Sequence, residues 1–303
     1  MINKALNPAR RFKHLVVPKI SSYLFGTSDA SVDLIVIGAQ KCGTTALYRY
    51  LSEHPDIEMP TTKELNYFTS IGTQQPSFET YRSLFPKRIG RNQQFSSVDI
   101  SPSYLLDAPT AAKNIQHLFP SAKLVVVLRE PVKRAISSWF MYKKYYQTQP
   151  NWYFEANWVA NSTNRNLETT PRSSTFGNNF VADIEEEIKV LESGGRIEYP
   201  IVEFGHYKDQ LKHYFSLFGS DEIKILESEE LKNSTQACLN QITDWIGLNT
   251  HKLAAHQLVP HFVGDNKHAI PVDDLSQLTQ YYERHNNGLE QLVGRKLSWT
   301  CAP

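Results

Sequence analysis

The sequence of 303 residues has few cysteines and no long apolar segment. Its three cysteines, Cys42, Cys238 and Cys301, lie far apart and are odd in number, which excludes a disulfide framework and the close ligand spacing of a zinc site. We therefore expect a reducing, cytoplasmic setting. The aliphatic run at 124–128 is far shorter than the roughly 20 residues of a transmembrane helix. The sequence therefore predicts no membrane-spanning segment.

The net charge of the chain is also small, because 32 Lys and Arg residues nearly balance 31 Asp and Glu residues. A dedicated nucleic-acid binder is normally strongly basic, so we expect no nucleic-acid partner. Residues 1–20 nevertheless contain several basic residues and no acidic one. We treat 1–30 as a basic N-terminal segment, for which peripheral contact with an anionic membrane surface and a solvated tail are the two interpretations. No apolar stretch follows these charges, as a secretory signal would require.

The remaining chain, 31–303, is predicted to form a single α/β domain. Apolar runs at 33–38 and 123–128 indicate buried parallel strands, and helical patterns follow them at 44–51 and from Pro131. Because strands alternate with helices, the predicted fold class is a central parallel sheet flanked by helices. Further helices are predicted at 181–193, 207–218 and 273–285, and a further strand at 223–226.

A polar stretch at 160–179 is predicted to be a long surface loop inserted in this domain. A functional lid and simple disorder are the two interpretations of such a loop. The segment before it, 139–158, is instead rich in aromatic residues. Aromatic faces can stack on sugars or line an acceptor cleft, whereas core packing is the simpler explanation for at least half of them.

The first functional motif is the segment Gly38-Ala39-Gln40-Lys41-Cys42-Gly43-Thr44-Thr45, between a predicted strand and a predicted helix. At such a position, glycines and the N–H groups of a helix N-terminus can cradle phosphate oxygens. The spacing of Gly38 and Gly43 matches the first half of a Walker A loop. That loop then requires lysine where this chain has Thr44, and the lysine here is Lys41. The alternative is a tight strand–helix turn that binds no ligand.

The second functional motif follows the strand at 123–128. A Walker B strand ends in an aspartate that holds Mg²⁺, whereas this strand is followed by Arg129. A cation at this place favours binding of a phosphate without a metal, and the Ser137 hydroxyl could reach the same phosphate. Taken alone, Arg129 could be a surface ion-pair partner, and Ser137 could be a helix residue with no role in binding.

These two motifs resemble those of sulfotransferases that use 3′-phosphoadenosine 5′-phosphosulfate (PAPS). The segment 38–47 resembles their 5′-phosphosulfate loop, and Arg129-Glu130-Pro131-x-x-Arg134-x-x-Ser137 resembles their 3′-phosphate motif. The similarity extends over 33–299 and is greatest to the branch that contains the heparan sulfate glucosaminyl N- and 3-O-sulfotransferases. The resemblance implies a P-loop NTPase-like sulfotransferase fold, PAPS as co-substrate, 3′,5′-adenosine bisphosphate as product, no metal requirement, and a saccharide acceptor.

The resemblance also implies roles within the site. Lys41 matches the lysine that acts on the leaving 5′-phosphate. The segment Lys63-Glu64-Leu65-Asn66-Tyr67-Phe68 resembles the one that supplies the base, which points to Glu64 as the group that takes the acceptor's proton. From that segment alone, Glu64 would be a surface carboxylate beside Lys63. The residues implied to hold the 5′-phosphate together with Lys41 are Cys42, Gly43, Thr44 and Thr45.

Two later positions and one departure complete the predicted site. Lys267 is implied as a phosphate contact and Phe262 as an aromatic ring on the nucleotide, with a core position as the alternative for Phe262. The heparan enzymes carry Glu-Lys where this chain has Asp99 followed by Ile100. Asp99 could hydrogen-bond the acceptor, orient Lys41, or simply cap the strand end, and Ile100 removes the family lysine.

Three functions from different classes remain in view: a PAPS-dependent sulfotransferase, a P-loop kinase or NTPase, and a non-catalytic relative that binds a nucleotide or a glycan. The missing lysine after Gly43 and the missing aspartate after Leu128 oppose the second. Retention of Lys41 and Glu64 opposes the third. We therefore predict transfer of a sulfuryl group to a hydroxyl or amine of a saccharide, with a lipid or a small alcohol as the other acceptor classes.

Overall fold

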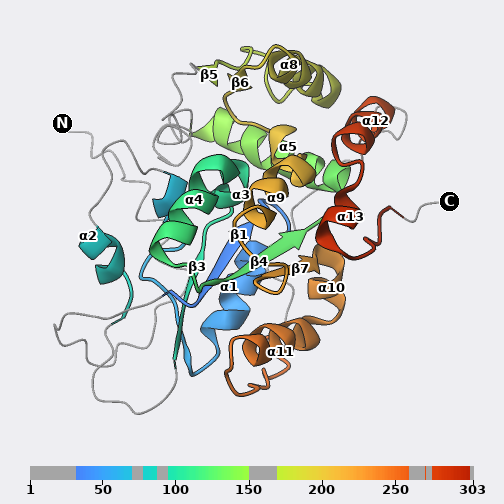
Figure 1. The fold of residues 1–303 in the computed structure, drawn as a ribbon. Helices are drawn as coiled ribbons and strands as arrows, with labels where there is room; N and C mark the ends of the chain where they lie inside the picture. Colours follow the sequence, from blue (N-terminus) through green and yellow to red (C-terminus); the bar gives the residue numbers. More distant parts are fainter. Residues whose placement is uncertain are drawn as a thin grey trace.

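The computed structural model describes residues 32–69, 78–86, 95–149, 169–258, 270 and 275–300. Its centre is a five-stranded sheet with the strand order β2-β3-β1-β4-β7, in which neighbouring strands are parallel (Figure 1). The predicted central parallel sheet is therefore confirmed. The strands are β1 (Leu34–Gly38), β2 (Ile57–Glu58), β3 (Ser96–Ile100), β4 (Lys123–Leu128) and β7 (Ile223–Glu227).

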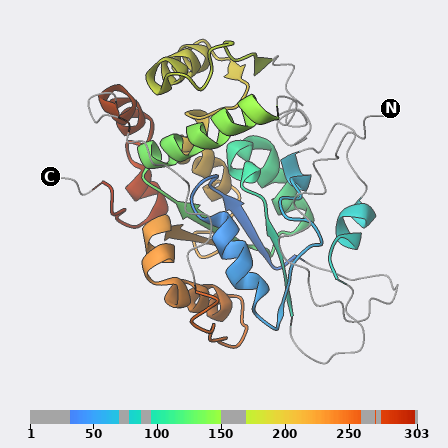
Figure 2. The same ribbon diagram turned by 180° about the vertical axis from the view of Figure 1, so that it is seen from behind.

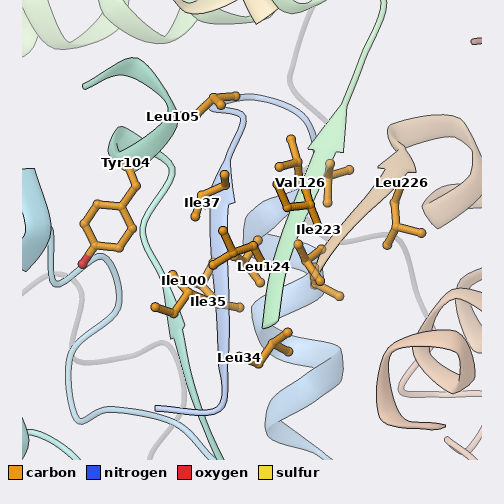
Figure 3. Packing of buried hydrophobic residues seen from close by; sticks show 14 of the residues in the cluster. Leu34, Ile35, Ile37, Ile100, Tyr104, Leu105, Leu124, Val126, Ile223 and Leu226 are labelled. Atoms are coloured by element: carbon orange, nitrogen blue, oxygen red, sulfur yellow. The ribbon is translucent and has the colours of Figure 1, made fainter. Parts of the chain in front are cut away.

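The two innermost strands, β1 and β4, are the segments whose apolar runs stand out in the sequence. Every residue of β1 is buried, and so is every residue of β4 except Lys123. Strands covered on both faces need such continuous apolar runs. Leu34 pairs with Lys123 on one side and with Val98 of β3 on the other, so the carboxyl ends of these strands reach the same edge of the sheet. Figure 3 shows the packing of Ile35 and Ile37 against Leu124 and Val126.

Helices cover both faces of the sheet (Figures 1 and 2). The first helix, α1 (Thr44–Ser52), lies on one face, and α3 (Ser103–Leu106), α4 (Ala108–Leu118) and α9 (Tyr207–Phe215) lie on the other. The long helix α5 (Pro131–Thr148) crosses above the edge where β1 ends. The other described α-helices are α2 (Phe78–Ser83), α8 (Phe180–Glu192), α10 (Ser228–Asn233), α11 (Thr235–Trp245), α12 (Ser276–His285) and α13 (Leu289–Val293).

A second, smaller core lies among α5, α8 and α12. Trp139 and Tyr142 of α5 are buried in it, and the indole nitrogen of Trp139 donates to Asp183 of α8 at 2.7 Å. These two aromatic residues of the 139–158 segment are therefore core residues. Residues 150–158 of that segment lie outside the described residues.

The polar stretch predicted as a surface loop is described from residue 169 onward. There, β5 (Thr169–Thr170) pairs with β6 (Arg196–Ile197), and both Arg172 and Phe176 are buried. Arg172 forms an ion pair with Glu187 of α8, and neither side chain is exposed. Most residues of 171–179 are exposed and lie in turns, and Arg172 and Phe176 attach this segment to the second core. An arginine can leave water here because a buried carboxylate balances its charge.

The predicted helices at 181–193, 207–218 and 273–285 correspond to α8, α9 and α12, although α9 ends at Phe215 and α12 begins at Ser276. Within the described ranges, no helix combines the length and the apolar composition that crossing a membrane requires.

Candidate functional site

The loop between β1 and α1 lies at the carboxyl edge of the sheet and turns sharply. Lys41 and Gly43 both have left-handed backbone angles, with φ of 68° and 101°. Glycine adopts this conformation without the steric cost that a Cβ brings. Gly38 has a different reason to be glycine, because a Cβ there would lie only 2.7 Å from the Cβ of Leu105. The loop is tied to the neighbouring strand by a hydrogen bond from the Ala39 N–H to the Val127 oxygen at 2.8 Å.

The N-terminus of α1 has the features of an anion site. Gly43 is the N-cap residue, no side chain caps the helix there, and its first turn contains no acidic residue. The first N–H groups of a helix have no partner within the helix, and the helix dipole makes this end positive. Thr44 and Thr45 stand in that first turn, Thr44 buried and Thr45 partly exposed. The predicted phosphate-binding residues are therefore gathered at one helix end.

One face of α5 holds this loop in place. Gln40 donates to the Tyr142 hydroxyl at 2.9 Å and accepts from the Ser138 hydroxyl at 3.1 Å. The Nζ of Lys41 lies 3.6 Å from the Sδ of Met141. Since these three α5 residues share a helix face, the loop and the helix are positioned together. The sequence motif pointed to Ser137, which is partly exposed, whereas its neighbour Ser138 is the serine that contacts the loop.

Arg129 is held at the junction of β4 and α5. The Glu130 carboxylate caps α5 by accepting from the N–H groups of Val132 and Lys133, each at 2.7 Å, and Pro131 occupies the first helical position. The Nη1 of Arg129 donates to the main-chain oxygen of Lys41 at 3.3 Å. Its Nε is buried and makes no hydrogen bond to the described residues. A guanidinium N–H in this state suits an incoming oxyanion.

Arg134, the second arginine of the segment that resembles the 3′-phosphate motif, lies on α5. It is fully buried and donates to the main-chain oxygen of Ile201, while its Nε and Nη1 have no hydrogen-bond partner among the described residues. Burial lowers the pKa of Lys41, the Glu64 carboxylate raises it, and the charges of Arg129 and Arg134 lower it again, with a net decrease. The pocket is thus electropositive and poorly hydrated, which favours an anion.

Glu64 lies near Lys41, as the motifs predicted. Its backbone is left-handed, with φ of 62°, and its carboxylate forms an ion pair with Lys63. The Glu64 side chain is 43% exposed, so solvent and an acceptor have access to it. Burial, and then the charge of Glu64, raise the pKa of Tyr145 on α5. The Glu64 carboxylate also acts on the charge of Lys41.

Asp99 does not lie among these residues. The side chain of this β3 residue is fully buried and accepts hydrogen bonds from the hydroxyls of Tyr104, Tyr81 and Ser101. Burial raises its pKa to about 6, and those hydroxyls hold it below a still higher value. Neither a direct bond to an acceptor nor a contact with Lys41 matches this position. Its carboxylate instead bonds to side-chain hydroxyls inside the core.

The remaining predicted positions differ in what the structure shows of them. Phe262 and Lys267 lie outside the described residues.

A cavity of about 100 Å³ opens beside Arg129, where the carboxyl ends of β4 and β7 meet the C-terminal segment with Ser298 and Trp299. The Ser298 N–H donates to Glu227 at 3.0 Å, which fixes that segment against β7. The cavity is lined by residues of both charges: Arg129 and Lys133, and Glu130, Glu227 and Glu229.

The site has the strand–loop–helix arrangement of a P-loop, and Arg129 stands where a Walker B strand has its metal-holding carboxylate. A family model described as a sulfotransferase domain matches residues 31–294. The chain belongs to the sulfotransferase family, as the resemblance of its two motifs indicated.

Individual relatives agree with this family. The bifunctional heparan sulfate N-deacetylase/N-sulfotransferase 1 of Caenorhabditis briggsae is 29% identical over 231 residues, which cover 74% of this chain and 23% of that protein. The human heparan sulfate glucosamine 3-O-sulfotransferase 3B1 is 24% identical over 302 residues, which cover 92% of this chain and 68% of the relative. The chain therefore spans less than a quarter of the first relative.

A solved structure shows the same fold. The sulfotransferase from Alicyclobacillus acidocaldarius superimposes with a TM-score of 0.63 at 24% identity, and the match covers 89% of this chain and 98% of that one.

Proposed function

We propose that the protein is a PAPS-dependent sulfotransferase that moves a sulfuryl group to a hydroxyl or amine of a saccharide. One observation carries the proposal: the Glu64 carboxylate lies close enough to raise the pKa of Lys41, in a loop that Arg129 also binds. A cationic pocket for phosphates and a candidate base thus border the same space. Membership of the sulfotransferase family supports the class of reaction.

The residues present fit PAPS. The open N-terminus of α1, with Lys41, Thr44 and Thr45, suits the 5′-phosphosulfate. Arg129, with a buried and unpartnered Nε within the described residues, suits the 3′-phosphate, and the partly exposed Ser137 stands two turns further along α5. When bound, PAPS supplies the activated sulfuryl group.

The chain's own residues then have separate tasks. Lys41 neutralises the negative charge that grows on the leaving 5′-phosphate, and the N–H groups of the loop hold that phosphate still. Glu64 accepts the proton that the acceptor hydroxyl or amine releases. Because the Lys41 ammonium is largely desolvated, its attraction for the leaving group exceeds what a lysine in water would provide.

A saccharide is the proposed acceptor class. The support is that relatives of this chain are named as heparan sulfate sulfotransferases.

The proposal is tested by transfer of labelled sulfate from PAPS to a panel of glycans, lipids and small alcohols. Binding is measured in parallel, as thermal stabilisation by 3′,5′-adenosine bisphosphate and by ADP with Mg²⁺. We expect stabilisation by the bisphosphate and transfer to at least one glycan. Stabilisation by Mg-ADP alone would contradict the proposal and favour a kinase or NTPase. Stabilisation by the bisphosphate without transfer to any acceptor would favour a non-catalytic relative.

A further inference from the structure

Asp99 is the centre of a buried cluster of hydroxyl groups between β3 and α3. One of its oxygens accepts from the Tyr104 hydroxyl at 2.7 Å and from the Tyr81 hydroxyl at 3.1 Å, and the other accepts from the Ser101 hydroxyl at 2.8 Å. None of its surface is exposed. A buried carboxylate is costly unless its oxygens are hydrogen-bonded, and here three hydroxyls meet that need.

Two of these hydroxyls hold a second segment of the chain at the same time. The Ser101 Oγ accepts from the N–H of Asn66 at 3.2 Å, and the Tyr104 Oη accepts from the N–H of Tyr67 at 3.0 Å. Each hydroxyl therefore donates to Asp99 and accepts from one of two consecutive main-chain amides. The segment that receives this support begins two residues after Glu64.

That segment needs support, because its backbone is held in unfavourable angles. Glu64 and Asn66 both have positive φ, 62° and 51°, a conformation that is unfavourable for residues with a Cβ and that asparagine adopts more readily than glutamate. Such angles persist only where the surroundings fix them. A further hydrogen bond, from the Ser103 hydroxyl to the Asn66 side-chain oxygen at 2.6 Å, adds to the two amide contacts.

We propose that Asp99 is a positioning residue: through the hydroxyls of Ser101 and Tyr104, it fixes the backbone that places Glu64 beside Lys41. The inference rests on the proposed function only for the chemical role of Glu64. It also explains why an acidic residue stands at a buried strand position where an apolar one would pack more readily.

The proposal depends on the direction of the hydrogen bonds. An ionised carboxylate accepts only, so it draws both hydroxyl hydrogens toward itself and leaves their oxygens free for the two amides. An asparagine at this place has one accepting oxygen and one donating NH₂ group. The NH₂ group would donate to one of the hydroxyl oxygens. The hydrogen of that hydroxyl would then point toward a main-chain N–H, which is itself a donor. Asp99→Asn therefore disturbs the amide contacts without changing the volume of the core.

The chain offers a matched control. Tyr81 also donates to Asp99, but neither the 66 nor the 67 amide bonds to it. Tyr81→Phe thus removes one bond to the same carboxylate and leaves the path to Glu64 intact. A role of Asp99 confined to core stability would make Tyr81→Phe and Tyr104→Phe similar in effect, whereas the proposal makes them different.

The activity test is a double-mutant cycle with Asp99→Asn and Glu64→Gln, read as kcat for sulfate transfer. We expect Asp99→Asn to lower kcat about 10- to 100-fold, with the Kd for 3′,5′-adenosine bisphosphate almost unchanged. In the Glu64→Gln background, the same change should lower kcat less than about twofold, because its effect passes through Glu64. Fully additive effects, or a parallel loss of bisphosphate affinity, would overturn the proposal.

A second readout does not depend on activity. Amide hydrogen exchange in a peptide that covers 64–69 should speed up in Asp99→Asn and in Tyr104→Phe, and should stay near the wild-type rate in Tyr81→Phe. Unchanged exchange in the first two variants would overturn the proposal even if no acceptor were found. If the wild type transferred no sulfate, the proposed function would fail, and the exchange rates would still decide the structural link.

Discussion

Arg129 donates a hydrogen bond from its Nη1 to the main-chain oxygen of Lys41, at 3.3 Å. The bond joins the segment after β4 to the loop after β1, so the two predicted phosphate contacts are parts of one structure. It also brings two cations together in a pocket where burial already lowers the pKa of Lys41. Such a concentration of positive charge is unfavourable on its own and becomes favourable when a polyanion binds.

The first prediction concerns Lys41. Lys41→Ala should abolish sulfate transfer and weaken binding of 3′,5′-adenosine bisphosphate about 10- to 100-fold, because a hydrogen bond to a charged group contributes about 1.5–3 kcal/mol. Isothermal titration calorimetry measures the affinity. Lys212→Ala is the control, since Lys212 is exposed and pairs with the exposed Asp209. Equal affinities of the Lys41→Ala variant and the wild type would remove Lys41 from the phosphate site.

The second prediction separates Arg129 from Lys41. Arg129→Ala should raise the KM for PAPS about 10- to 100-fold and change kcat little, because a contact with the 3′-phosphate is the same before and during transfer. Arg129→Lys should restore only part of the loss, since lysine lacks the planar fork of N–H groups. Steady-state kinetics at varied PAPS gives both constants, with the exposed Arg284→Ala as the control. An unchanged KM would make the 3′-phosphate assignment wrong.

The third prediction concerns Glu64. Glu64→Gln should lower kcat about 10²- to 10⁴-fold, the usual contribution of a positioned base, and leave the bisphosphate affinity near that of the wild type. The comparison is with Glu53→Gln, a change at an exposed carboxylate that bonds to Gln257. Rates are measured with the best acceptor of the panel. Full activity of the Glu64→Gln variant would exclude Glu64 as the base.

The parts of the fold that could be predicted from the sequence are those with local signals. The apolar runs of β1 and β4, the glycines of the loop and Pro131 at the start of α5 act within a few residues of where they stand. β3 carries a weaker signal, because only Val98 and Ile100 of its sequence Ser-Ser-Val-Asp-Ile alternate as apolar residues. The burial of Asp99 depends on hydroxyl partners on α2 and α3, which the strand's own sequence does not contain.

The site residues divide in the same way, into those with a local sequence signal and those whose positions depend on packing. The motifs pointed to Lys41, Arg129 and Glu64, and the structure places Lys41 against Arg129 and within the electrostatic reach of Glu64. The motif analysis chose Ser137 and did not single out Ser138, because a shift of one position along a helix turns a side chain by about 100° and only packing decides which serine faces the loop. The buried positions of Asp99 and Arg172 depend on contacts that no local pattern contains.

The fourth prediction concerns the ion pair that holds the second core. Glu187 is fully buried, pairs with Arg172, and accepts from the N–H groups of Ile201, Val202 and Glu203 at 2.7, 2.7 and 3.0 Å. Glu187→Gln removes the charge but keeps the size of the side chain. In that variant the buried Arg172 keeps its longer pair with the partly exposed Glu186 but loses its buried partner. We therefore expect the free energy of unfolding, measured by urea denaturation, to fall by up to about 3–5 kcal/mol.

A neighbour on the same helix provides the control for that experiment. Glu186 also pairs with Arg172, at 3.4 Å, but its side chain is 29% exposed. Glu186→Gln should therefore cost less than about 1 kcal/mol, as partly exposed pairs usually do. Equal losses for the two variants would show that burial does not determine the strength of the pair at Glu187.

The fifth prediction concerns pH and His206, the first residue before α9. Its ring stacks on that of His285 with centroids 4.5 Å apart, and its Nε2 is buried without a hydrogen-bond partner among the described residues. Burial, and then the charge of His285, lower the pKa of His206 to about 3. Because the unfolded chain takes up a proton near pH 6.5 and the folded chain does not, this residue adds stability above pH 6.5. That stability is lost as the pH falls toward 3.

His206→Phe keeps the aromatic ring and removes the titration. The difference in unfolding free energy between this variant and the wild type should therefore move in favour of the variant by about 2 kcal/mol between pH 7 and pH 5. The contribution of Asp99 to stability changes with pH in the opposite direction. Because the pKa of Asp99 is raised, its contribution to the unfolding free energy is present at low pH and is lost as the pH rises through about 6. That contribution is common to both proteins and cancels in the difference. Urea unfolding of both proteins at several pH values measures this difference in unfolding free energy. If the unfolding free energies of the variant and the wild type changed in parallel with pH, folding would not lower the pKa of His206.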